Sequence, residues 1–363
     1  MPLEGNAMIT NITLENFKCF RKVEVNPRLI TVFIGPNGTG KSSVLQALAL
    51  LKQSVGEGGR FNFTGNLVNF GEFDQICPKF DGVEDQLLLG FRGRYEPPEL
   101  GITSISGEGV VTYEVQPNAG NLNVTKREPA GLPERILAHL KMVPDARGLV
   151  RPRYDLGPHK VEDVSLAGGL SQQENQTATT LGYSRSLESR ISSLLGRVTG
   201  IGLRVDIVPS QDVEVMGLSA VGDVNMVAEG FGSNALILLL LQLTSAVSGA
   251  TVMIEEPEIH LHPKAQAELA SVLVEEAKAE NKQLIMTTHS EHILGRLLTL
   301  VAENKLDVDE LAIYAFEKDE EGVCTAEKLE VAADGRVKGG LKDFFESHLD
   351  ELNRYVKALQ TKE

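Results

Sequence analysis

ITVFIGPNGTGKSSVLQALALL, residues 30–51, joins an apolar run to a glycine-rich loop and then to a helical pattern. The apolar run 29–34 predicts a buried strand. Val44, Leu45 and Leu48 recur at the spacing of one helix face, so a helix is expected directly after the glycines. Strand, glycine loop and helix in this order form the context in which such a loop binds phosphate.

The loop GPNGTGKS at residues 35–42 fits the pattern GxxxxGK[ST]. Glycines let backbone N–H groups close around phosphate oxygens, and the following helix directs its positive end at the same place. Lys41 adds a full charge there, and Ser42 is expected to ligate Mg²⁺. A glycine-rich turn that only caps a helix is the plain alternative. The predicted nucleotide-binding residues of the loop are Gly35, Pro36, Asn37, Gly38, Thr39, Gly40, Lys41, Ser42 and Ser43.

A second apolar strand, TVMIEEP at residues 251–257, ends in two carboxylates. Glu255 is expected to hold Mg²⁺ and Glu256 to orient the attacking water, the two roles that phosphoryl transfer to water requires. A strand that ends in acidic residues is common, so this interpretation depends on the phosphate loop.

A third strand, QLIMTTHS at residues 283–290, ends in a histidine. A histidine beside a nucleotide can sense the γ-phosphate and hold the water in line. Lys41, Glu256 and His289 are therefore the predicted catalytic residues. The alternative for His289 is a neighbour of a helix N-cap with no contact to nucleotide.

The segment EEPEIHLHP, residues 255–263, offers Glu258, His260 and His262 as metal ligands, since His-x-His presents two imidazoles on one side of an extended chain. No third or fourth ligand is evident nearby, and Pro263 marks the start of a helix. A loop that touches the nucleotide of a partner subunit is therefore favoured over a zinc site.

The order of elements predicts an α/β fold. Helical patterns at 233–247, at 263–279 and from 290 alternate with strand patterns at 251–255 and 283–287, as in a parallel sheet with helices on its faces. Alternating or apolar runs at 8–14, 86–95 and 110–115 predict an additional antiparallel sheet.

Three regions are expected. Residues 1–125 form an N-terminal lobe with the phosphate loop and the antiparallel sheet, and residues 206–363 form a C-terminal lobe with the carboxylates and His289. Residues 126–205, rich in Gly, Pro, Gln, Ser and Arg, predict an inserted arm with one amphipathic helix near 187–198. A last strand and a charged helix at 344–356 follow. No heptad pattern persists, which excludes a long coiled coil.

Composition limits the partners. The chain of 363 residues has 35 Lys and Arg against 50 Asp and Glu, a net charge of −15 that repels nucleic acid and anionic membranes. DNA contact would need a local basic face, for which the arm supplies candidates, with a solvated arm of scattered arginines as the alternative. The candidates are Arg147, Arg151, Arg153, Lys160, Arg185, Arg190 and Arg197.

The sequence suggests a cytoplasmic location. Cys19, Cys77 and Cys324 are separated in the chain and form neither a CxxC pair nor a disulfide framework. The longest apolar run, 235–243, is too short for a bilayer span of roughly 20 residues. The N-terminus lacks the pattern of a secretory signal, so no membrane association is expected.

Together, ITLENFKCF at 12–20, the phosphate loop, IEEPEIHLHP and TTHS resemble the ATPase heads of the ABC class related to the SMC, RecF and OLD families. More narrowly, they resemble AAA-type ATPases described alongside OLD proteins. The resemblance covers residues 1–125 and 206–363. It implies a P-loop NTPase head of the ABC type, with a mixed central sheet, that dimerises with two ATP molecules between protomers.

The resemblance also assigns roles to residues. It implies phosphate binding by residues 35–43, Mg²⁺ ligation by Ser42 and Glu255, catalysis by Glu256 and switching by His289. Such heads carry a further metal-ligating glutamine, for which Gln75 in NFGEFDQICP is the best-placed candidate, with a plain surface glutamine as the alternative.

The signature segment departs from the family pattern. Such heads show a Leu-Ser-Gly-Gly run before a helix, whereas residues 227–234 read VAEGFGSN, with Ala228 in place of the usual serine. Gly230, Gly232 and Ser233 are still expected to meet a phosphate of the opposite protomer. A buried helix with a glycine-containing start is the alternative.

Two functions are expected. The first is an ATPase whose ATP-driven dimerisation switches action on DNA or on a separate nuclease or effector, in repair or in defence against foreign DNA. The second is an assembly ATPase that sequesters an effector, with slow hydrolysis and no nucleic acid. No CxxC hook is present, and the residues after TTHS are too few for the nuclease domain of OLD proteins, so any nuclease is expected on another polypeptide.

Overall fold

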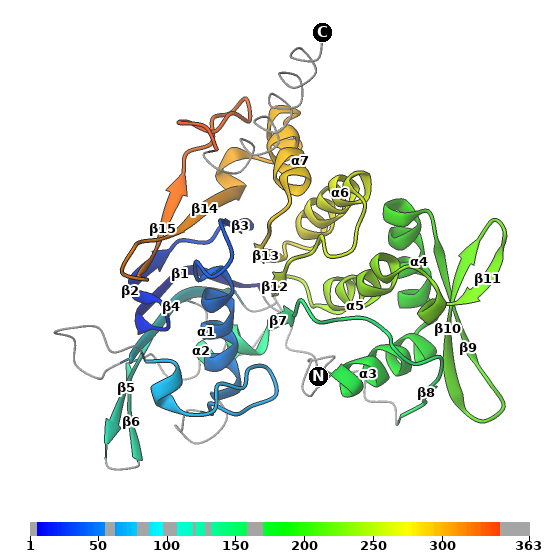
Figure 1. Ribbon diagram of the computed structural model, residues 1–363, viewed down its shortest axis with the longest axis horizontal. Helices are drawn as coiled ribbons and strands as arrows, with labels where there is room; N and C mark the ends of the chain where they lie inside the picture. Colours follow the sequence, from blue (N-terminus) through cyan, green and yellow to red (C-terminus); the bar gives the residue numbers. More distant parts are fainter. Residues whose placement is uncertain are drawn as a thin grey trace, which may run out of the picture.

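The computed structural model describes residues 6–54, 62–77, 87–96, 107–118, 121–127, 132–157 and 170–341. A central sheet separates a half that contains α1 and a second sheet from a half that is mostly helical (Figure 1). The charged helix expected at 344–356, and Lys160 of the expected basic face, lie outside the described residues.

Six strands of the described chain form the central sheet, in the order β15-β14-β3-β13-β12-β7. All neighbours are parallel except β15, which pairs antiparallel with β14, so the expected mixed α/β sheet is confirmed. The strands are β3 (Ile30–Ile34), β7 (Leu140–Val143), β12 (Thr251–Glu255), β13 (Gln283–Thr287), β14 (Leu311–Lys318) and β15 (Cys324–Leu329).

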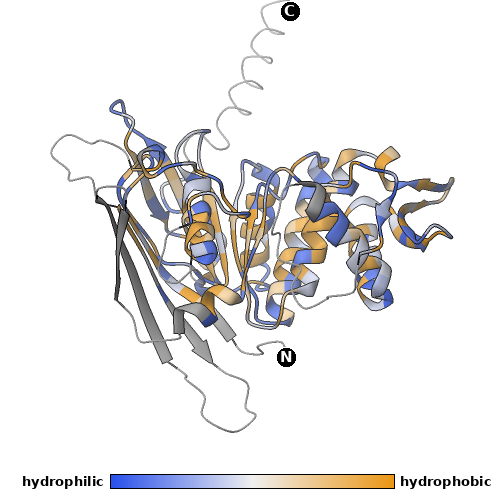
Figure 2. Ribbon diagram, turned by 90° about the horizontal axis from the view of Figure 1, so that it is seen from below, coloured by the Kyte–Doolittle hydropathy of each residue, from blue (hydrophilic) through white to orange (hydrophobic). Residues whose placement is uncertain are grey.

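Helices or a second sheet cover both faces of this sheet, which explains why its inner strands read as continuous apolar runs. In β3, Ile30, Val32 and Ile34 pack on the side of the later helices, whereas Phe33 packs on the side of α1. Hydrophobic residues accordingly gather in the central strands and the helices beside them (Figure 2). The covering helices are α1 (Lys41–Ser54), α5 (Phe231–Ser245), α6 (Pro263–Ala279) and α7 (Glu291–Ala302).

The antiparallel sheet expected near the N-terminus is present. Its order is β2-β1-β4-β5-β6, and its residues Leu14 and Phe17 share a buried cluster with Leu45 and Leu48 of α1. This sheet therefore holds α1 from the side opposite to the central sheet. The strands are β1 (Asn6–Phe17), β2 (Phe20–Val25), β4 (Leu87–Glu96), β5 (Gly107–Asn118) and β6 (Asn121–Arg127).

The segment expected as an arm is partly built into the main body. β7 lies at the edge of the central sheet, and α4 (Arg185–Thr199) buries Ile191 and Leu195 in the same cluster as α5 and α6. The amphipathic helix is thus confirmed, but it does not project. The lobe boundaries at 126 and 205 stay a prediction. The remaining elements of this half are α2 (Leu132–Ala138), β8 (Tyr154–Asp155), α3 (Leu170–Tyr183), β9 (Gly202–Ile207), β10 (Asp212–Ser219) and β11 (Gly222–Asn225).

Two cysteines lie closer together than the sequence suggested, whereas the apolar helix is buried as expected. Cys19 and Cys324, far apart in the chain, are neighbours: the Cys324 amide donates to the Cys19 carbonyl at 2.8 Å. Burial and contact with Cys324 raise the pKa of the Cys19 thiol to about 12. α5 is buried on nearly every side, and no helix in the described ranges is long and apolar enough to cross a bilayer.

The first glycine of the phosphate loop has no room for a side chain. Gly35 has φ of +138°, and an added Cβ would lie 2.3 Å from the carbonyl oxygen of Phe316 in β14. We expect Gly35→Ala to lower the free energy of unfolding by about 2–4 kcal/mol, from backbone strain and overpacking. Gly38→Ala is the matched control, because Gly38 also has positive φ but open space around it; a loss of about 1 kcal/mol is expected. If urea unfolding showed equal losses of stability for Gly35→Ala and Gly38→Ala, this explanation would be contradicted.

Candidate nucleotide-binding site

The phosphate loop connects the carboxyl end of β3 to the start of α1. Its middle residues Pro36, Asn37 and Gly38 are exposed, whereas Lys41 is only 6% exposed. The Lys41 ammonium donates to the carbonyl oxygens of Gly35 and Pro36, both at 2.8 Å. Burial lowers the pKa of Lys41, and the nearby Glu256 and Glu258 partly offset that effect. A buried ammonium that faces an open loop is suited to an anion.

Glu255 lies at the carboxyl end of β12, beside the start of α1. Its carboxylate accepts hydrogen bonds from the Ser42 hydroxyl and the Asp145 amide. The pKa of Glu255 is raised to about 7, mainly by burial and to a smaller extent by repulsion from Asp145. One carboxylate and one hydroxyl side by side are the hard oxygen ligands with which proteins hold Mg²⁺ beside phosphates, so the donor set fits the expected ion.

Glu256 and His289 face each other where β12 and β13 end. His289 Nε2 lies 3.8 Å from Glu256 Oε1. Burial and the charge of Lys41 lower the pKa of His289, so its imidazole is neutral near pH 7. Lys41 therefore interacts electrostatically with both Glu256 and His289. The three predicted catalytic residues lie at one end of the sheet.

The loop after Glu256 orders this end of the sheet. Glu258 accepts from the His289 amide at 2.6 Å, and His262 Nδ1 accepts from the Lys264 amide as the N-cap of α6. Within the described residues, no group of three or more His, Cys, Asp or Glu is placed to hold a metal ion. The zinc alternative for this loop therefore has no structural support.

The signature-like segment lies apart from the phosphate loop of its own chain. Gly230 is the N-cap of α5, and Ala228 ends a 3-10 turn, η2 (Met226–Ala228), just before it. Gly232 lies so close to the next loop that an added Cβ would be 2.5 Å from the His260 carbonyl oxygen. The exposed Phe231 ring packs on the His260 imidazole, with centroids 5.4 Å apart.

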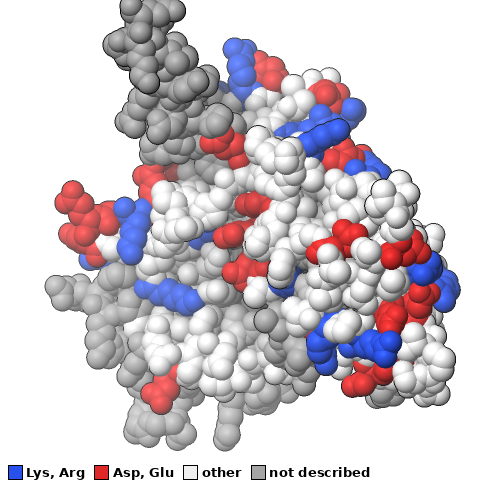
Figure 3. Space-filling model, turned by 45° about the vertical axis from the view of Figure 1, so that its right-hand side comes forward, with Lys and Arg blue, Asp and Glu red and all other residues white. Residues whose placement is uncertain are grey.

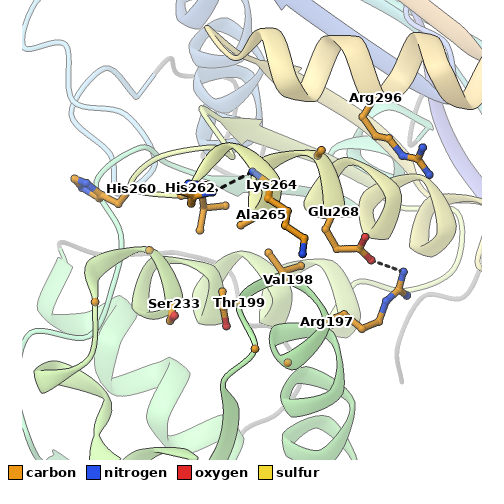
Figure 4. Close-up of a pocket in the computed structure, with 16 residues that line it drawn as sticks. Arg197, Val198, Thr199, Ser233, His260, His262, Lys264, Ala265, Glu268 and Arg296 are labelled. Carbon is orange, nitrogen blue, oxygen red and sulfur yellow. Dashed lines mark hydrogen bonds and ion pairs between the residues drawn. The ribbon is translucent and has the colours of Figure 1, made fainter. Parts of the chain in front are cut away.

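A pocket of about 760 Å³ opens between α4, α5 and α6 beside this segment. Gly230, Gly232 and Ser233 line one wall, and the Lys264 side chain points into the space from α6 (Figure 4). Arg197 and Glu268 form an ion pair at 3.0 Å along its edge. None of the lining residues belongs to loop 35–43, so the structure does not bring the signature-like residues to their own Lys41.

Gln75 is exposed at the end of the short turn η1 (Phe73–Gln75). The neighbouring Ile76 carbonyl accepts from the Lys18 amide at 2.7 Å, which fixes this loop to the turn between β1 and β2. The role of Gln75 as a metal ligand stays a prediction.

The basic face expected from the arm arginines is not formed as predicted. Arg147 is only 8% exposed and bonds to backbone carbonyls, so it cannot lie on a DNA-binding surface. The other candidates in the described chain pair with acids: Arg151 with Glu174, Arg153 with Glu214, Arg185 with Glu188, Arg190 with Glu276 and Glu280, and Arg197 with Glu268 and Glu275. Basic and acidic side chains interleave on the face in Figure 3. The partners of Arg190 and Arg197 come from α6 and from its C-cap Glu280, and the sequence did not place α6 beside the arm.

Two further residues of the site were not predicted. The Lys18 ammonium lies 4.2 Å from the centre of the Phe70 ring and interacts electrostatically with Glu255. Lys18 belongs to ITLENFKCF, so the motif that carried the resemblance contained the signal. Arg147 donates to the backbone of Glu255 and Glu256, whereas the sequence had suggested it only for a basic face.

The raised pKa of Glu255 leads to a prediction about stability. Because folding raises this pKa from 4.5 to about 7, the folded protein binds the proton more tightly, and the resulting stability is lost as the pH rises through this range. Without Mg²⁺, Glu255→Gln should therefore be more stable than the parent by on the order of 3 kcal/mol at about pH 8. In urea unfolding, the gain should fall to less than about 1 kcal/mol near about pH 5. A difference that is the same at both pH values would contradict the assignment.

The chain is similar to known ATPases. A family model described as AAA ATPase domain matches residues 8–88 and 175–294, more than half of the chain. The OLD nuclease of Thermus scotoductus is 25% identical in an alignment 326 residues long, which covers 78% of this chain and 59% of that protein. The chain thus spans less than two thirds of the length of this curated relative.

Solved structures of SMC heads share the fold. One is an Smc head bound to the C-winged helix domain of ScpA, with a TM-score of 0.60 and 17% identity over 89% of this chain and 98% of that chain. Another is an Smc head with an extended coiled coil bound to the C-terminal domain of ScpA, derived from Pyrococcus furiosus, with a TM-score of 0.59 and 13% identity over 98% and 100% of the chains. The fold is thus that of an SMC-like ATPase head of the ABC class, and the chain belongs to the AAA ATPase domain family.

Proposed function

We propose that this protein binds and hydrolyses ATP as an ABC-class head. The observation that carries the proposal is the convergence of Lys41, Glu255, Glu256 and His289 at the carboxyl ends of β3, β12 and β13. A cation, an acid bonded to Ser42 and an acid beside a neutral histidine are the groups that phosphoryl transfer to water requires.

Each group has a distinct role in the proposed reaction. Loop 35–43 and Lys41 bind the β- and γ-phosphates, while Ser42 and Glu255 hold Mg²⁺, which neutralises phosphate charge when bound. Glu256 orients a water and accepts its proton as the water oxygen attacks the γ-phosphorus and ADP leaves. The neutral His289 donates a hydrogen bond to the γ-phosphate side of the site.

Two protomers complete the proposed unit. The pocket beside Gly230, Gly232 and Ser233 is lined by no residue of the chain's own loop 35–43, and we assign it to the nucleotide of a second copy. Backbone amides at the start of α5 supply the anion contacts that Ala228 cannot. ATP is thereby a bridge that holds a homodimer.

Downstream, we propose that dimerisation switches action on DNA or on a separate nuclease or effector, in repair or in defence, within the cytoplasm. The support is similarity to a protein named as an OLD nuclease, of which this chain spans 59%. The pairing of the described arm arginines with acids specifically favours the second function, an assembly ATPase that holds a protein effector without nucleic acid.

The mass of Glu256→Gln in solution tests the dimer and separates these functions. It would be measured with and without Mg-ATP, and then with a short DNA duplex added. An ATP-dependent doubling supports the sandwich dimer, and a further DNA complex only with ATP supports action on DNA. A doubling without DNA binding favours the assembly ATPase, and a mass indifferent to ATP would refute the nucleotide-bridged dimer.

A further inference from the structure

Arg147 is a buried cation at the centre of the loop that follows β7. Its guanidinium donates to three main-chain carbonyls: Nη1 to Pro144 at 2.8 Å and to Glu255 at 2.7 Å, and Nη2 to Glu256 at 2.8 Å. A guanidinium is suited to this task, because its rigid fork directs several donors at once and it remains charged when buried. Two of the three carbonyls belong to the proposed metal-binding and catalytic residues.

Glu256 is a residue that needs such support. Its φ of +43° lies in the left-handed region, which costs a residue other than glycine roughly 1 kcal/mol or more. The Glu256 amide donates to the carbonyl oxygen of Thr287 at 3.1 Å and to its hydroxyl at 3.2 Å. Arg147 holds the carbonyl on the other side. Hydrogen bonds thus restrain the peptide groups on both sides of Glu256. They fix the direction in which its carboxylate points away from the backbone.

The loop that carries Arg147 is itself held at both ends. β7 pairs in parallel with β12, which places the start of the loop beside the end of the Glu255 strand. At the far end, the Leu149 amide donates to Asn234 Oδ1 and the Leu149 carbonyl accepts from Asn234 Nδ2, both at 2.6 Å. Asn234 lies in the first turn of α5, next to Ser233. Loop 144–149 therefore connects the signature-like segment to the backbone of Glu256.

We propose that Arg147 is a positioning residue for ATP hydrolysis. By holding the Glu256 carbonyl it keeps Glu256 in the left-handed conformation that presents the carboxylate to the attacking water. The loop of Arg147 is also bonded, through Leu149 and Asn234, to the start of α5, where the second nucleotide is expected. The orientation of Glu256 is thereby coupled to that part of the fold. This inference rests on the proposed function.

Arg147→Lys tests the proposal, because it keeps the charge but removes the fork. We expect kcat for ATP hydrolysis to fall on the order of 10²-fold, as for a misplaced catalytic group, with the Kd of a fluorescent ATP analogue changed by less than about twofold. Arg190→Lys is the control: Arg190 also bridges two acceptors, Glu276 and Glu280, but between α4 and α6, and kcat should not change. An ATP-induced rise in melting temperature verifies that each variant is folded.

The double variant with Glu256→Gln separates positioning from a general structural role. If Arg147 acts through Glu256, Arg147→Lys lowers the residual rate of Glu256→Gln no further. An equal further loss in that background, or a loss of ATP affinity as large as the loss of kcat, would overturn the proposal. If Arg147→Lys does not fold, Thr287→Val removes the side-chain acceptor on the other side of Glu256 and should likewise lower kcat while leaving Kd unchanged; an unchanged kcat counts against the proposal. A parent rate in Glu256→Gln alone would instead refute the catalytic assignment of Glu256.

Discussion

Replacement of Glu256 by Gln is expected to lower the rate of ATP hydrolysis by roughly 10²- to 10⁴-fold, the range that a general base contributes. The amide keeps the size of the side chain and can still hydrogen-bond a water, but it cannot accept the proton. ATP binding should persist, because Lys41 and the loop glycines are untouched. The measurement is single-turnover hydrolysis of ATP together with equilibrium binding of a fluorescent analogue.

Glu276→Gln provides the matched control for that variant. Glu276 lies on α6, pairs with Arg190 at 2.6 Å and belongs to none of the segments that form the proposed nucleotide site. The same change of charge there should leave hydrolysis at the parent rate. Comparable losses in the two variants would show that general charge or stability, rather than the position of Glu256, governs the rate.

Lys41→Ala is expected to weaken ATP binding by about 10- to 100-fold, since a hydrogen bond to a charged group contributes about 1.5–3 kcal/mol. In the free protein the Lys41 ammonium donates to Gly35 and Pro36, and phosphate oxygens would take over those bonds. Titration with Mg-ATP by calorimetry measures the effect.

Lys52 offers a close control on the same helix. Its ammonium also donates to two main-chain carbonyls, those of Ala138 at 3.3 Å and Leu140 at 2.6 Å, but at the opposite end of α1. Lys52→Ala should cost stability without changing ATP affinity. If Lys52→Ala weakened ATP binding as much as Lys41→Ala, loop 35–43 would not be the nucleotide site.

The parts of the site that were predictable from the sequence follow from local rules. Glycine spacing and the switch from strand to helical periodicity identified the loop before Lys41, because both signals lie within a short stretch. Parallel strands end at one edge of a sheet, so Glu255 and His289 were expected near the loop once β12 and β13 were recognised as strands. The order β3-β13-β12 confirms that sheet.

The parts that were missed depend on contacts between distant segments. Arg147 reaches Glu255 across 108 positions, and nothing in its neighbourhood distinguishes a buried arginine from an exposed one. The acids that pair with Arg190 and Arg197 lie on α6 or at its C-cap, so the arginines of the expected basic face form ion pairs instead. β7 is only four residues long within a segment of loop-like composition, which hid its place in the sheet.

β7 also limits how this protein can be taken apart. A deletion of residues 126–205, meant to remove an accessory module, would strip an edge strand from the central sheet and remove the arginine that restrains Glu256. The accessory segment and the catalytic machinery are therefore not modular. Grafting this head onto another scaffold requires residues 140–149 to be included, although 108 positions separate Arg147 from Glu255.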